Sequence, residues 1–148
     1  MTVARIGLLA LVAAGPLLLG AGAGSRIVAF SPENREATDF GPLTAYLEDK
    51  GAEGDIWLKL GTGEILKGRF EVKAGGSVGA LGKAYGIDRP GGAYIGAGRP
   101  LVGGSPAFID MKRPSGATVH CEVMNDDANV KGSGVCLFSN GAVYRVLY

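Results

Sequence analysis

Apolar and polar residues alternate through the segment 43–72, and this alternation predicts antiparallel strands. Residues 43–48, 56–60 and 65–72 each place apolar residues or glycine at every second position on one face. A period of two is typical of strands with one buried face, whereas a helix needs a period near 3.6. Turn-forming residues at 49–51 and 61–63 separate the three stretches. The segment therefore predicts three strands joined by tight turns.

The glycine at position 63 favours one register for the second of these turns. A three-residue loop with Gly63 in the left-handed conformation makes a bulged hairpin in which Leu58 faces Leu66. A two-residue turn would shift the pairing by one residue and place Lys67 opposite Leu58, which reverses one strand's faces. The bulged hairpin is therefore predicted; it also pairs Ile56 with Gly68 and places Lys59, Lys67 and Arg69 together on the other face.

Strand signals recur before and after this block. Residues 26–30 predict a first strand, and residues 106–111 and 117–124 predict a hairpin. A closing hairpin is expected around the Ser-Asn-Gly turn at 139–141. Between the first two strands, Ser31 followed by Pro32 favours a helix start, with at most one or two turns before Gly41 and Pro42. Within the second hairpin, one face is expected to carry Val119, Cys121 and Val123.

The segment 74–100 is rich in glycine. Nine of its 27 residues are glycine, yet apolar residues such as Leu81, Ile87 and Ile95 persist. The expected structure is a loop region with one or two weak strands; a mobile binding loop is the alternative, because loops often carry function. With 26 glycines in 148 residues and many short apolar runs, the chain is predicted to be all-β. The expected architecture is an antiparallel meander, small sheet or partly open barrel of hairpins, with at most one short helix.

The first 23 residues have the composition of a secretory signal peptide. Arg5 precedes an uncharged apolar stretch from Ile6 to Leu19, and Ala21 and Ala23 have the spacing of a cleavage site. Retention as an anchor is the alternative, but the stretch is short for a span and contains Gly15 and Pro16. We therefore expect a single β domain over 24–148, exported to the periplasm or secreted, with no integral membrane span after cleavage.

Charge is balanced over this expected mature chain. Arg5 is the only charge before Gly24, so residues 24–148 carry 14 basic and 14 acidic side chains. Binding to nucleic acid depends on clustered lysine and arginine, so a balanced and interspersed set argues against it. The two cysteines, Cys121 and Cys136, both lie in this region, and an oxidising compartment favours a disulfide between them.

Catalytic and cofactor motifs are sparse. His120 is the only histidine, and in strand order its neighbours Val119 and Cys121 point to the other face, so no catalytic residue is assigned. The segments 77–84 and 92–100 fail the phosphate-loop and dinucleotide patterns, and no cofactor is expected. A calcium loop at Asn125, Asp126 and Asp127 is an alternative to a simple turn, but its spacing is wrong, and no metal site is predicted.

Two short segments resemble each other and a known repeat. The segment beginning at Gly54 can be laid over the one beginning at Gly132, so that Gly63 falls on Gly141 and Lys67 on Arg145. Both resemble hairpins of the MORN repeat family, although Val146 stands where those units usually carry glycine. In the second copy, the residues that carry the resemblance are Gly132, Gly134, Phe138, Asn140, Gly141, Tyr144 and Tyr148.

The C-terminal part also resembles small exported bacterial proteins of uncharacterised function. The shared features are a signal peptide, a Cys-Glu pair, a Gly-x-Gly-x-Cys motif and a terminal Gly-x-x-Tyr-x-Val motif. They correspond here to Cys121-Glu122, to residues 132–136, and to Gly141, Tyr144 and Val146. The resemblance implies a compact secreted β domain and implies no activity.

The sequence favours a non-enzymatic binding or structural module of the cell envelope. Its expected partner is another envelope protein or a cell-envelope polymer, bound through outward residues Tyr46, Trp57, Ile65 and Leu147 if these form one patch. The alternative is a small hydrolase or ligand-binding protein that uses the glycine-rich segment as a lid, with His120, Asp88 or Arg99 at its pocket. An oligomer formed along an uncovered sheet edge is a further possibility.

Overall fold

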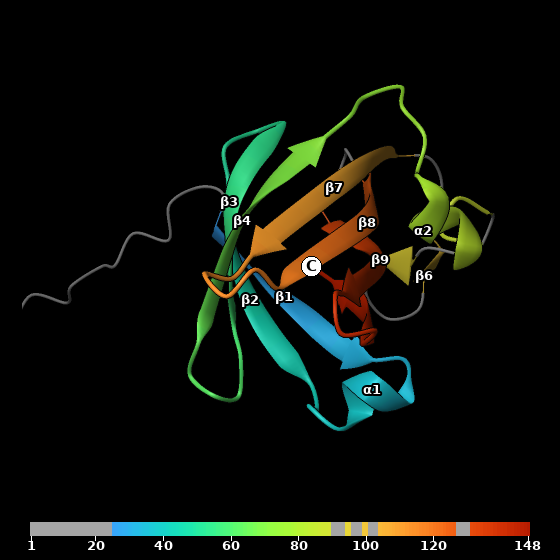
Figure 1. Ribbon diagram of the computed structural model, residues 1–148. Helices are drawn as coiled ribbons and strands as arrows, with labels where there is room; N and C mark the ends of the chain where they lie inside the picture. The colour runs from blue at the N-terminus through green and yellow to red at the C-terminus, as the bar shows by residue number, and fades with distance from the viewer. Residues whose placement is uncertain (1–24, 90–93, 96–98, 101–103, 127–130) are drawn as a thin grey trace, which may run out of the picture.

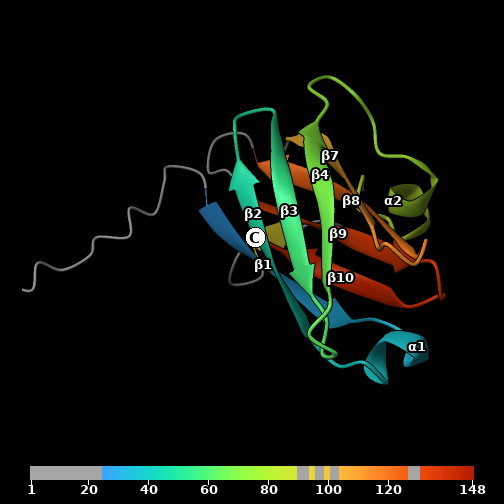
Figure 2. The same cartoon turned by 60° about the vertical axis from the view of Figure 1, so that its left-hand side comes forward.

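The fold is an eight-stranded antiparallel barrel. The computed structural model describes residues 25–89, 94–95, 99–100, 104–126 and 131–148, so the expected signal peptide lies outside the described residues. Eight strands follow one another around the barrel in chain order, except that β5 and β6 are left out between β4 and β7, and β1 closes the ring by pairing with β10 (Figures 1 and 2). The strands are β1 (Ser25–Pro32), β2 (Leu43–Asp49), β3 (Glu53–Lys59), β4 (Ile65–Val72), β7 (Ser105–Lys112), β8 (Thr118–Asp126), β9 (Lys131–Phe138) and β10 (Val143–Leu147).

The all-β prediction is confirmed, and the sheet closes into a barrel in which each strand pairs with a neighbour on both sides. Formation of an oligomer stays a possibility that the fold does not test. The predicted bulged register is also confirmed: Leu58 pairs with Leu66 and Ile56 with Gly68, and Gly63 has a φ of 87°. Only glycine adopts this left-handed conformation without strain, so this residue fixes which face of β4 points inward.

Alternating side chains fill the barrel. Val28, Leu47, Leu58, Phe70 and Ile109 are each buried in one continuous core with side chains from all eight strands. An eight-stranded barrel has an interior just wide enough for such side chains. The predicted disulfide is present inside the barrel, where Cys121 of β8 lies directly opposite Cys136 of β9.

A single helical turn lies at one end of the barrel. Helix α1 (Arg35–Thr38) follows β1, and Figure 1 shows it below the ends of β1 and β2. A short helix was predicted here, but its predicted start is wrong: Ser31 and Pro32 continue β1, and the side chain of Asn34 caps the helix by accepting from the Ala37 N–H at 3.0 Å. Pairing of β1 with both β2 and β10 extends the strand past the local helix signal.

The glycine-rich segment contributes a second short helix beyond the one expected. Helix α2 (Ala80–Ala84) lies against the outer wall of the barrel at β8 and β9, and a two-stranded sheet of β5 (Tyr94–Ile95) and β6 (Arg99–Pro100) follows it (Figure 1). Val78 and Ile87 flank α2 and are buried against Val135 and Val143 on the wall. Tertiary packing therefore stabilises a helix too short and too rich in glycine to be predicted from propensity. Among the described residues, no helix has the length and apolar character needed to cross a membrane.

Candidate functional site

A row of large side chains crosses the outer face of five neighbouring barrel strands, with one residue on each strand. We call it the aromatic–lysine row; it follows the register of β1, β2, β3, β4 and β7, and successive members are direct cross-strand partners. Directly opposite residues in antiparallel strands have Cβ atoms about 4.5–5.5 Å apart, so neighbours in the row can contact a common ligand. Its members are Ile27, Tyr46, Trp57, Lys67 and Lys112.

The apolar half of the row is open to solvent. The exposed fractions are 64% for Ile27 and 56% for Tyr46, and Trp57 is partly exposed. Exposed aromatic side chains on a sheet face are common elements of binding surfaces because they offer large, rigid contact areas. The structure thus places Tyr46 and Trp57, two of the predicted surface residues, side by side.

The other two predicted surface residues lie beside the row. Ile65 is half exposed and pairs with Lys59, one row further along β3 and β4. Leu147 is 42% exposed and faces Ala29 of β1, two residues from Ile27. All four predicted residues are therefore on the outer face, with Leu147 and Ile65 at opposite ends of the apolar part.

Sequence reasoning missed the lysine end of the row. It placed Lys67 on the outer face, but Lys112 reaches Lys67 only because β7 pairs with β4 across more than thirty intervening residues. Ile27 was also not singled out, because its neighbours depend on the pairing of β1 with β2. The alternation along each strand could show that Ile27 and Lys112 face outward. Only the order of strands in the barrel shows that they join the row.

Two carboxylates on β3 near the row are engaged with other cations. Asp55 binds Lys50 at 2.7 Å, and Glu53 binds Arg69 at 2.7 Å. The hydrogen bond between Lys50 and Asp55 raises the pKa of the lysine and lowers the pKa of the aspartate. Among the ion pairs that the described residues form, none involves the three lysines on and beside the row, Lys59, Lys67 and Lys112.

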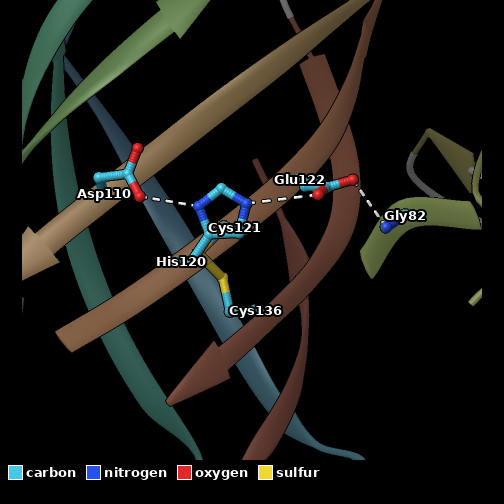
Figure 3. Close-up of polar contacts among 6 residues, drawn as sticks. All are labelled: Gly82, Asp110, His120, Cys121, Glu122 and Cys136. Atoms are coloured by element: carbon cyan, nitrogen blue, oxygen red, sulfur yellow. Dashed lines mark hydrogen bonds and ion pairs between the residues drawn. A yellow bond between two sulfur atoms is a disulfide. The ribbon is translucent and has the colours of Figure 1, made fainter. Parts of the chain in front are cut away.

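A second polar group surrounds His120 on the outer wall of β8. Its Nδ1 lies 2.7 Å from Asp110 Oδ1, and its Nε2 lies 3.3 Å from Glu122 Oε1 (Figure 3). The other oxygen of Glu122 accepts the backbone N–H of Gly82 in α2 at 2.7 Å. Phe108 stacks against the imidazole with ring centroids 6.4 Å apart. This outward position agrees with the surface strand histidine expected from the sequence.

The group around His120 joins α2 to the barrel, and it does not have the sequence of nucleophile, histidine and carboxylate that makes a catalytic triad. Asp110 holds one ring nitrogen as a triad carboxylate does, but the other nitrogen faces Glu122 instead of a hydroxyl or thiol nucleophile. The adjacent Cys121 points inward and is bonded to Cys136. Burial lowers the pKa of His120, but the hydrogen bonds and charges of the two carboxylates outweigh burial and raise it above its usual value.

The remaining candidate residues are dispersed. Asp88 is exposed after α2, and Arg99 begins the short strand β6. Asn125 is buried and accepts the Tyr148 hydroxyl at 3.2 Å, while Asp127 lies outside the described residues. Within the described ranges, no cluster of three or more histidine, cysteine, aspartate or glutamate side chains has a geometry suited to a metal ion.

The chain was compared with known protein families, curated proteins and solved structures. No family model, curated protein or solved structure matches the chain.

Proposed function

We propose that the protein is a non-enzymatic, exported binding module that holds an acidic polysaccharide of the cell envelope on the aromatic–lysine row. The observation that carries this proposal is the direct pairing of Lys67 with Lys112 at the end of an exposed aromatic row. The signal-like N-terminus and the Cys121–Cys136 disulfide support an exported protein.

The lysine pair favours an anionic partner. Like charges directly opposite each other on neighbouring strands destabilise a sheet. Lys67 and Lys112 occupy such positions, and the ion pairs of the described residues leave both ammonium groups without a carboxylate. A carboxylate of a bound polymer placed between them would relieve the repulsion. Lys59, beside Trp57 on β3, adds a third cation next to the aromatic side chains.

The aromatic half favours a polymer of sugars. The face of an aromatic ring is electron-rich, so polarised C–H groups of a sugar ring pack against it. Tyr46 and Trp57 are cross-strand partners and offer two such rings within a distance that successive sugar units can span. A polymer lying along the row would place sugars on these rings and acidic groups at the lysines.

Affinity electrophoresis with polygalacturonate in the gel tests this function. We expect the oxidised chain to be retarded by polygalacturonate, to be unaffected by neutral dextran, and to lose retardation as salt screens the charges. Lys67→Gln combined with Lys112→Gln should weaken retardation about tenfold, a loss of about 1.4 kcal/mol. The matched control combines Lys83→Gln with Lys131→Gln, which removes the same charge from exposed positions outside the row.

The comparison between the two double variants decides the outcome. Retention of binding by the control variant and its loss in the row variant would support the site. Equal loss in both variants would show that net charge, and not the row, is responsible. Equal retardation by double-stranded DNA would contradict a polysaccharide site, because DNA offers phosphates without sugars exposed for stacking.

A further inference from the structure

A cavity of about 330 Å³ opens at the end of the barrel that carries α1. This volume is within the range of about 300–1,000 Å³ typical of small-molecule sites. The cavity is bounded by the chain after α1, by the turn between β3 and β4, and by the turns that follow β7 and β9. An eight-stranded barrel can hold one small ligand in this position when the side chains of one end leave room.

The walls of the cavity are apolar. Leu66, Val119 and Tyr144 form its inner part and are almost fully buried. Leu43, Leu60 and Phe138 line it nearer to solvent. At the rim, Phe40 is 62% exposed although it is a large apolar side chain. Exposure of an apolar ring at the opening of an apolar cavity is typical of a site that a ligand covers.

The polar groups around the cavity are engaged within the protein. Arg113, the one cation among the lining residues, donates hydrogen bonds from Nε and Nη2 to the two carboxylate oxygens of Glu64. The hydroxyl of Ser139 accepts the Thr118 N–H at 3.1 Å, and the side-chain oxygen of Asn140 accepts the Ala142 N–H at 3.0 Å. These contacts fix the turns around the opening and leave no unpaired cation to attract an anion.

The hydroxyl of Tyr144 connects the cavity to α1. It lies 3.1 Å from the carbonyl oxygens of both Ala37 and Gly41, and its one proton is donated to this pair of acceptors. Burial of this hydroxyl raises the pKa of Tyr144, so the side chain is neutral at physiological pH. Asp39, which follows α1, contributes a carboxylate to the lining. The lining therefore carries one arginine, whose charge is paired with Glu64, and one carboxylate, that of Asp39. This arrangement disfavours an anionic ligand.

We propose that this cavity binds a small, uncharged and mainly apolar molecule, such as a medium-chain alcohol or a compact aromatic compound. The apolar part enters between Leu66, Val119 and Phe138, and Phe40 covers it from the rim. The site is separate from the aromatic–lysine row, since its lining contains none of the row residues. The described residues of the glycine-rich segment 74–100 do not line the cavity. The lid function of that segment stays a prediction.

Fluorescence of the neutral probe N-phenyl-1-naphthylamine tests the proposal. We expect the probe to bind the oxidised chain at one site with increased emission, and 1-octanol to displace it. Octanoate at pH 8 should displace it at least tenfold less effectively, because its carboxylate meets Asp39 and finds Arg113 already paired. Displacement by octanoate as effective as by octanol would overturn the assignment of an uncharged ligand.

Two variants locate the probe. Ala117→Phe places a ring at the cavity from the turn after β7 and should reduce probe affinity at least tenfold. The matched control Ala84→Phe adds the same ring at an exposed position on α2 and should leave affinity unchanged. Phe40→Ser, an exposed substitution that leaves the core intact, should weaken binding severalfold. Unchanged binding in both Ala117→Phe and Phe40→Ser would overturn the site, whatever the outcome of the polysaccharide experiment.

Discussion

His120 and Glu122 lie on the same outward face of β8, two residues apart, with Nε2 and Oε1 separated by 3.3 Å. The histidine is partly exposed, whereas the glutamate side chain is only 4% exposed beneath α2. A buried carboxylate needs hydrogen bonds or a nearby cation. Here Glu122 has both, the Gly82 N–H and the imidazole, so this pair couples the packing of α2 to the protonation of one histidine.

Stability is expected to fall as pH rises through the pKa of His120 in the folded protein. The two carboxylates raise this pKa above the value of 6.5 expected for the unfolded chain. The folded state therefore binds the proton more tightly, so the stabilisation is complete below about pH 6.5 and is lost as pH rises through the folded-state pKa. Because His120 is the only histidine, its imidazole proton resonance measures the pKa directly.

The matched variant for this prediction is His120→Gln. It should remove this step from a plot of unfolding free energy against pH above about 6.5, while steps from other groups remain. A resonance that titrates below pH 6.5 would contradict the prediction, because it would mean that burial outweighs Asp110 and Glu122.

Loss of the Glu122 carboxylate should loosen α2. Glu122→Ala leaves the Gly82 N–H without its acceptor in a buried position, which costs about 1–3 kcal/mol. Glu71→Ala, an exposed change on β4, should cost less than about 0.5 kcal/mol. Urea unfolding gives both values, and hydrogen exchange of the Gly82 amide shows whether the effect is local. Equal stability of the two variants would contradict this role of Glu122.

The pattern of alternating residues was sufficient to predict the barrel strands, and Gly63 was sufficient to predict the register of one hairpin. Leu58 faces Leu66, as the bulge at Gly63 required. This relationship is local: one turn and its flanking strands contain all the information that determines it.

Relationships between distant strands could not be obtained in this way. Lys112 meets Lys67 because β7 returns to β4 after the glycine-rich segment, and no local rule fixes that choice. Closure by β1 and β10 likewise joins the two ends of the barrel, and it overrode the helix signal at Ser31. The cavity near Phe40 depends on how α1 and three turns gather at one end, which the period of two does not encode.

Removal of the disulfide should lower stability by about 3 kcal/mol, because a bridge closing a fifteen-residue separation restricts the unfolded chain. The double variant Cys121→Ala, Cys136→Ala tests this by urea unfolding, and reduced wild-type protein provides an independent comparison. Both should unfold at lower urea concentration than the oxidised chain. Coincident transitions for oxidised and reduced protein would show that the bridge adds no stability.

Glycine at position 134 is required by the close approach of β8 to β9. A Cβ at this position would collide with the backbone at Glu122 and Val123. We expect Gly134→Ala to destabilise the barrel by about 1–3 kcal/mol, the usual cost of overpacking a core. Gly61→Ala is the control, since a Cβ there meets open space, and it should change stability by less than about 0.5 kcal/mol. Similar costs for the two substitutions would be contrary to this explanation.

Emission from Trp57 during titration with polygalacturonate tests the proposed function most directly. Trp57 is the only tryptophan in the chain and lies between Tyr46 and Lys67 in the row. Sugar stacking on a partly exposed indole should shift its emission to shorter wavelength, with a saturable dependence that Lys67→Gln combined with Lys112→Gln moves to about tenfold higher polymer concentration. Retardation by the polymer without any change in Trp57 emission would contradict the account, because the polymer would then bind elsewhere.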